Sequence, residues 1–187
     1  MTTSLIIVLA IAFLLIVWII SMYNNLVKLR NNRENAFADI DVQLKQRHDL
    51  IPQLVSTVKG YAVHEKETLD RVISARNQAV AANTINDKIK AENQLDGALA
   101  GMRVTLEAYP DLKANQNFLQ LQGEISDVEN KLSAVRRFFN SATKELNNKV
   151  EIFPSNLIAS LFNFHKEPMF DLKEQRKDLE EVPKIEF

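Results

Sequence analysis

The chain has 187 residues, of which 25% are charged, and its formal net charge is −1 at pH 7. This balance argues against a nucleic-acid partner, because nucleic-acid-binding domains normally carry a basic excess. The absence of cysteine excludes disulfides, thiolate metal sites and cysteine nucleophiles.

Residues 1–23 carry no charged side chain and predict a transmembrane anchor. Residues 5–20 read LIIVLAIAFLLIVWII, an unbroken apolar run. With its uncharged neighbours the run reaches about 20 residues, or roughly 30 Å of helix, which matches the hydrocarbon thickness of a bilayer. A cleaved signal peptide is the alternative, but the start MTTS has no basic residue and no small-x-small cleavage site follows the run.

Basic residues follow the anchor, and none precedes it. Lys28, Arg30 and Arg33 lie just beyond the apolar run, with Glu34 among them. The positive-inside tendency therefore predicts a single-pass protein of the cell membrane, with the N-terminus outside and the remaining chain in the cytoplasm. An extracytoplasmic binding module would require the opposite orientation.

Residues 24–152 predict an antiparallel up-down four-helix bundle, so the expected fold class is all-α. Apolar residues recur every three or four positions from Phe118 to Val150, which is typical of a long helix with one buried face. A second stripe from Leu26 to Tyr61 fits a heptad register, as in a coiled coil. A break near GYAVH keeps the first helix short enough for the last one to cover it. The expected helices are 24–60, 65–82, 88–108 and 115–150, the first being continuous with the anchor.

The stretch RHDLIPQLV, residues 47–55, interrupts the second stripe with charged residues and a proline. Pro52 cannot donate a hydrogen bond to the carbonyl of His48, so a kink in the first helix is expected there. The apolar register continues on both sides of the proline, which favours a kink. The alternative is a new helix that is capped by Asp49, with Pro52 in its first turn.

Arg47 occupies an inward-facing position of the heptad register and therefore needs a partner. Folding the last helix antiparallel against the first, with Tyr61 near Asn115, places Arg47 opposite Glu129. The hypothesis is a structural polar layer that fixes helix register; a binding site for an anionic ligand is the competing interpretation. A second acidic and basic rung is expected closer to the membrane, from Asp39 or Asp41 on one side and Arg136 and Arg137 on the other.

Two glycines, Gly97 and Gly101, lie four residues apart on the third predicted helix. In a membrane this spacing would indicate helix dimerisation. In a soluble bundle, small residues of this kind instead let a neighbouring helix approach closely, which is the interpretation preferred here.

The C-terminal part divides into two segments. Residues 153–173 begin FPSNLIASLFNF and are expected to return to the membrane-near end of the bundle. They would either cap the bundle or lie on the lipid surface. Residues 174–187 are highly charged and predict a mobile tail.

Several blocks of the sequence resemble the LemA family of bacterial membrane proteins. The resemblance implies a single N-terminal span with the N-terminus outside, a cytoplasmic helical bundle and no established enzymatic activity. It also implies varied genetic settings, some beside a membrane metalloprotease and one linked to magnetosome formation. Phe37 stands where the family often has Trp, and Phe139 and Leu146 where it often has Tyr. The blocks are YNNLVKLRNN (23–32), IDVQLKQRHDLIPQLVSTVKGYAVHE (40–65), YPDLKANQNFLQLQ (109–122), ENKLSAVRRFFNSATKELN (129–147) and FPSNLIASLF (153–162).

Patterns that would indicate an active site, a cofactor or a metal centre are missing from the sequence. HEKET, residues 64–68, begins like a zinc-protease motif but has Thr68 where the second histidine is required. His48 and His64 would lie about 24 Å apart on one helix, too far to share a metal. No Gly-rich phosphate loop occurs. We therefore expect no catalytic, cofactor or metal residues.

An anchor joined to a helical bundle without an active site predicts a membrane-tethered, non-enzymatic scaffold. The expected partners are the lipid bilayer and further copies of the chain. The alternative is an adaptor or regulator of a membrane protease or an envelope-stress system, and it rests on the family resemblance alone.

Overall fold

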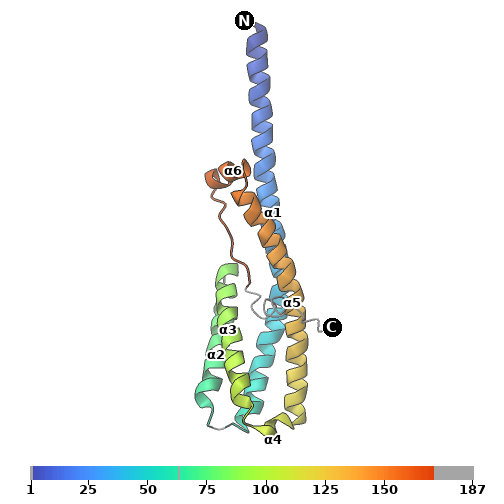
Figure 1. Cartoon of the computed structure of the whole chain (residues 1–187), viewed down its shortest axis with the longest axis vertical. Helices are drawn as coiled ribbons and strands as arrows, with labels where there is room; N and C mark the ends of the chain where they lie inside the picture. Colours follow the sequence, from blue (N-terminus) through green and yellow to red (C-terminus); the bar gives the residue numbers. More distant parts are fainter. Residues whose placement is uncertain (1, 63, 171–187) are drawn as a thin grey trace, which may run out of the picture.

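The computed structural model describes residues 2–62 and 64–170, and every regular element in these ranges is a helix (Figure 1). This confirms the predicted all-α class. The four predicted bundle helices end within three residues of their expected positions, and two short helices, α4 and α6, were not anticipated. The helices are α1 (Thr2–Lys59), α2 (Lys66–Ala81), α3 (Ile85–Leu106), α4 (Pro110–Lys113), α5 (Gln116–Glu151) and α6 (Ser155–Leu161).

Helix α1 joins the apolar N-terminal run to the bundle without interruption. The helix has 58 residues, and its N-terminal part projects well beyond the other helices (Figure 1). The side chains of residues 5–20 are exposed, and the first buried one is that of Leu26. This long apolar helix is compatible with a membrane anchor. Pro52 lies inside α1, so the alternative of a separate helix that begins at Asp49 is wrong.

The bundle consists of one long helix pair and one shorter hairpin. Helices α1 and α5 run antiparallel along each other, and α2 and α3 pack together against the half that is farther from the N-terminus (Figure 1). Because α2 and α3 have 16 and 22 residues and α5 has 36, the hairpin cannot cover the whole pair. The half that is nearer the N-terminus is covered by α6 and by the segment that follows it.

Apolar residues form three successive core clusters along the bundle. The far cluster contains Ile51, Val72, Leu95 and Ile125 and takes residues from all four long helices. The middle cluster includes Phe37, Ile40, Leu132 and Phe139. The near cluster joins Leu26 and Leu146 to Ile158 of α6.

The end of α6 turns the chain back along the bundle. Asn163 adopts a left-handed conformation, with φ 57°, which Asn tolerates better than most residues. The amide of Phe164 donates to the carbonyl of Ala159 at 2.9 Å, and that of Asn163 donates to Ser160 at 3.4 Å, as in a Schellman motif. Residues 164–170, which we call the strap, then run down beside α1 and α5 (Figure 1). Residues 171–173 and the predicted tail 174–187 lie outside the described residues.

The two glycines of α3 do not serve the packing role expected for them. Gly97 and Gly101 lie on the exposed face of α3, and a Cβ added at either would meet no atom within 4 Å. Among residues 2–62 and 64–170, no helix packs against this face, because the apolar stripe of α3 faces the other way.

Candidate functional site

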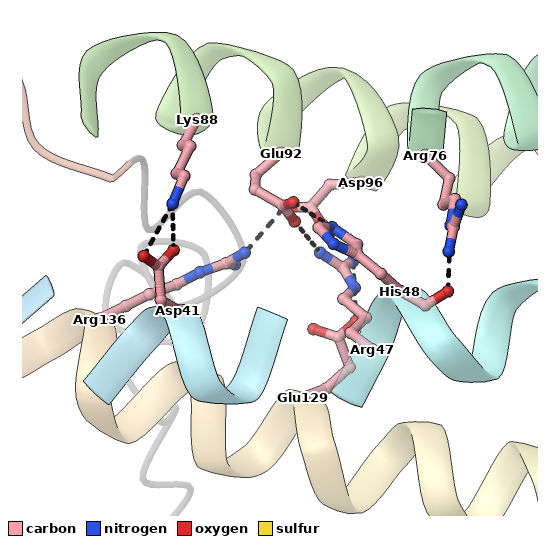
Figure 2. Close-up of polar contacts among 9 residues, drawn as sticks. All are labelled: Asp41, Arg47, His48, Arg76, Lys88, Glu92, Asp96, Glu129 and Arg136. Atoms are coloured by element: carbon pink, nitrogen blue, oxygen red, sulfur yellow. Dashed lines mark hydrogen bonds and ion pairs between the residues drawn. The ribbon is translucent and has the colours of Figure 1, made fainter. Parts of the chain in front are cut away.

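A buried arginine of α1 lies at the centre of a polar layer that crosses the bundle (Figure 2). Arg47 Nη1 lies 2.9 Å from Glu92 Oε2, its Nη2 lies 2.8 Å from Glu129 Oε1, and Nη2 also donates to Asp96. The side chains of Arg47 and Glu92 are 3% and 1% exposed. Carboxylates from α3 and α5 thus surround a guanidinium that bulk water hardly reaches. We call the set the Arg47 layer; it comprises Arg47, His48, Glu92, Asp96 and Glu129.

Glu92 links the arginine to a histidine. His48 Nε2 lies 2.6 Å from Glu92 Oε1, while the other carboxylate oxygen accepts from Arg47. In the tautomer that carries its proton on Nε2, His48 donates this hydrogen bond to the carboxylate. Both oxygens of this buried carboxylate are therefore satisfied by residues of α1.

The neighbouring helix compensates for the backbone hydrogen bond that Pro52 removes. Proline has no N–H, so the carbonyl of His48, four residues earlier, loses its helical donor. Arg76 of α2 donates from Nε to this carbonyl at 3.1 Å (Figure 2). The same turn of α1 thus contacts α3 through the side chains of Arg47 and His48, and it contacts α2 through the backbone carbonyl of His48.

The Arg47 layer separates the far and middle core clusters. On α1 Arg47 and His48 lie between Leu44 and Ile51, and on α3 Glu92 lies between Ile89 and Leu95. Burial by itself would lower the pKa of Arg47, but the carboxylates of Asp96, Glu129 and Glu92 outweigh burial and raise it above the ordinary value. The guanidinium therefore stays charged, and its favourable interactions persist throughout the physiological pH range.

The structure brings some of the residues proposed from the sequence together and separates others. Arg47 and Glu129 are in contact, as an ion pair without hydrogen-bond alignment. The expected second rung is wrong for Asp41, which pairs with Lys88 of α3 through two contacts of 2.7 Å. Arg136 instead approaches Asp96 at 3.5 Å, and Asp39 and Arg137 lie on exposed faces. Pairing α1 with α5 alone overlooked α3, which supplies Lys88 and Asp96 at this level.

The sequence reasoning missed the two carboxylates of α3. Leu95, Leu99, Met102 and Leu106 form the buried stripe of this helix. Continuing that stripe three residues toward the N-terminus reaches Glu92, an acidic residue at a core position that demands a buried cation. This signal was available, and Asp96 follows one helical turn later.

The geometry of the Arg47 layer suits a structural interaction better than ligand binding. An anionic ligand at Arg47 would meet the three carboxylates that already surround the guanidinium. Surface hollows lie elsewhere, beside Tyr61 and Asn115 and beside Asn83, and neither contains a residue of the layer. No group of three or more His, Asp or Glu side chains within residues 2–62 and 64–170 is placed to hold a metal ion.

A second buried arginine lies nearer the N-terminal half and contacts the strap. Arg33 Nη2 donates to Asn86 Oδ1 at 3.1 Å and to the carbonyl of Pro168 at 3.4 Å, and it lies 3.4 Å from Glu167 Oε2. Asn86 Nδ2 also donates to Glu167, at 3.2 Å. Burial lowers the pKa of Arg33, and the nearby Glu167 and Glu34 offset this only in part. We call Arg33, Asn86 and Glu167 the Arg33 layer.

Comparison with known proteins places this arrangement in one family. The family model described as the LemA family matches residues 36–187, which begins inside α1 after the apolar run. A curated relative, Protein LemA of Metamycoplasma hominis, is 28% identical over 161 residues. That alignment covers 84% of this chain and 73% of the relative.

Proposed function

Because this chain belongs to the LemA family, we propose that it acts as a membrane-tethered, non-enzymatic scaffold that presents a helical bundle to cytoplasmic partners and to copies of itself. The observation that carries this proposal is the continuity of α1. A single helix of 58 residues leads from an exposed apolar segment into a bundle whose polar interior is closed by its own side chains. One continuous helix thus joins the proposed anchor directly to the bundle.

The bacterial cell membrane is the proposed location, with the N-terminus outside and the bundle in the cytoplasm. Exposed Lys28 and Arg30 follow the apolar run and support this orientation under the positive-inside tendency. Arg33 is buried inside the bundle, so it does not add to the exposed positive charge next to the apolar run. A single cysteine placed at Thr3 or at Asn83 would be labelled from opposite sides of the membrane. Labelling of Asn83→Cys from outside intact cells would overturn the orientation.

Helix α6 is proposed to do two things at the membrane-near end. One face packs on the bundle through Ile158 and Ala159. The other face leaves Leu157 and Leu161 60% and 72% exposed, close to the anchor, where Phe162 contacts the ring of Tyr23 at 4.7 Å. An apolar face at the level of an interfacial tyrosine is suited to the lipid surface.

Quantitative pull-down from membranes in a gentle detergent tests the proposed function. A scaffold should recover a differently tagged copy of itself. Recovery of a stoichiometric membrane protease without a second copy would instead favour the adaptor role. A chain that is strictly alone and monomeric in the extract would overturn the scaffold proposal.

A further inference from the structure

The strap is held by α5 mainly through its backbone. Asn147 donates from Nδ2 to the carbonyl of Glu167 at 2.9 Å and accepts from the amide of the same residue at 2.8 Å. Asn140 repeats this pair with Phe170, at 3.0 and 2.9 Å. Each asparagine thus satisfies both backbone groups of one residue, as a neighbouring β-strand would. Such contacts bind extended chain without regard to its side chains.

The spacing of the two asparagines matches the rise of an extended peptide. Asn140 and Asn147 are one heptad apart, which is about 10.5 Å along a helix. Glu167 and Phe170 are three residues apart, which is about 9 to 10 Å in extended or polyproline conformation. The length of one heptad of α5 therefore matches the length of three residues of extended peptide. The docking site is thus complementary to an extended strand and not to a helix.

Side-chain contacts add selectivity at every third residue of the strap. The buried ring of Phe170 lies 6.3 Å from that of Phe37 and 5.7 Å from that of Phe139, and the Arg136 guanidinium lies 4.8 Å from it. Glu167 meets Arg33, as described above. Phe164 is 8% exposed and lies beneath the Arg30 guanidinium at 5.3 Å. The intervening residues His165, Lys166, Pro168 and Met169 are exposed.

We propose that the groove formed by Arg33 and Phe37 of α1 with Asn140 and Asn147 of α5 is a binding site for an extended peptide with an acidic residue three positions before a phenylalanine. The occupant in the assembled protein is the strap of a second copy. Each chain then gives its strap to a neighbour and receives one in return. This inference rests on the proposed self-association, for which it supplies the contact.

A second copy is the occupant that the structure favours. An exchanged strap re-forms the same contacts that it makes within its own chain, so exchange is nearly neutral in contact energy. Anchoring in one membrane also places the grooves of two copies at the same height above the lipid. Residues 165–170 reach roughly 20 Å when extended. That distance is enough to cross to a bundle that stands alongside.

Photo-crosslinking of the wild-type chain tests the exchange without disturbing the groove. Light chains carrying a photoreactive methionine analogue are co-reconstituted in liposomes with an equal amount of ¹⁵N-labelled chains. Met169 is 45% exposed on the strap, so its products identify the groove that the strap occupies. Crosslinks from light Met169 to heavy α1 or α5 peptides report exchange, whereas a strap that stays within its own chain crosslinks to light peptides alone.

With exchange, up to half of the Met169 crosslinks should reach heavy chains, because light and heavy grooves are equally abundant. Heavy chains with the double substitution Asn140→Ala and Asn147→Ala are the matched control and should lower that fraction at least fivefold. Heavy crosslinks from Met22, beside the anchor, without any from Met169 would overturn the exchange but leave self-association standing. Absence of heavy crosslinks from both positions would overturn the proposed self-association as well.

Discussion

The two buried arginines of α1 are satisfied in different ways. Arg47 is surrounded by side chains of α3 and α5, whereas Arg33 depends largely on the strap. The carboxylates around Arg47 outweigh its burial and raise its pKa, but burial outweighs the carboxylates around Arg33 and lowers its pKa. The comparison teaches that one layer joins helices to one another, while the other is completed by the non-helical strap.

The middle core cluster allows the sharpest test of this difference, because it contains phenylalanines from the helices and from the strap. Phe139 of α5 and Phe170 of the strap contact each other and are 0% and 3% exposed. Phe139→Ala should lower the free energy of unfolding by roughly 3–5 kcal/mol. Phe170→Ala should cost less than half of that, since the strap can undock while the helices stay folded. Urea unfolding followed by circular dichroism measures both; equal losses would mean that the strap folds as part of the core.

Within the Arg47 layer, Glu92→Ala should destabilise the bundle by about 3 kcal/mol, because it leaves Arg47 and His48 buried with fewer partners. Exposed Asp127→Ala on α5 is the control and should change stability by less than about 0.5 kcal/mol. The double substitution Arg47→Met and Glu92→Met should recover part of the loss, because the apolar pair needs no counter-charge and the remaining carboxylates of Asp96 and Glu129 are partly exposed to water. The same urea titration measures the free energy of unfolding of each variant. A double variant that is less stable than Glu92→Ala would contradict this explanation.

The contact between Arg76 and the carbonyl of His48 should be worth about 1–2 kcal/mol. Arg76→Met should therefore lower stability by that amount. In a Pro52→Ala background the helix regains its own donor to this carbonyl, so Arg76→Met should cost clearly less there. A double-mutant cycle in denaturant measures the coupling between the two positions. Zero coupling would show that Arg76 acts independently of the proline.

The smallest effects are expected on the exposed face of α3, away from both layers. Gly97→Ala and Gly101→Ala should each stabilise the bundle by up to about 1 kcal/mol, because alanine favours the helix and the added Cβ meets nothing. Thermal melting of the two variants provides the measurement. A loss of self-association in cells, despite higher stability, would identify this face as a contact between copies and would compete with strap exchange.

Much of the fold was predictable because it follows from local patterns. The stripe from Phe118 to Val150 predicted α5 within one residue at each end, and GYAVH marked the end of α1. The partners of Asp41 were not predictable from two helices considered alone. Lys88 reaches it from α3, whose axial position depends on the turn capped by Thr84.

The sequence by itself determined the helices, the apolar N-terminal run and the inward direction of Arg47, since helical periodicity and hydrophobicity act over a few turns. Only the tertiary structure decided that Glu92 and Arg76 meet the RHDLIPQLV turn and that the strap fills the space left by a short hairpin. These contacts join residues far apart in the chain. They depend on how several helices rotate and slide against one another at once, and no single periodicity encodes that.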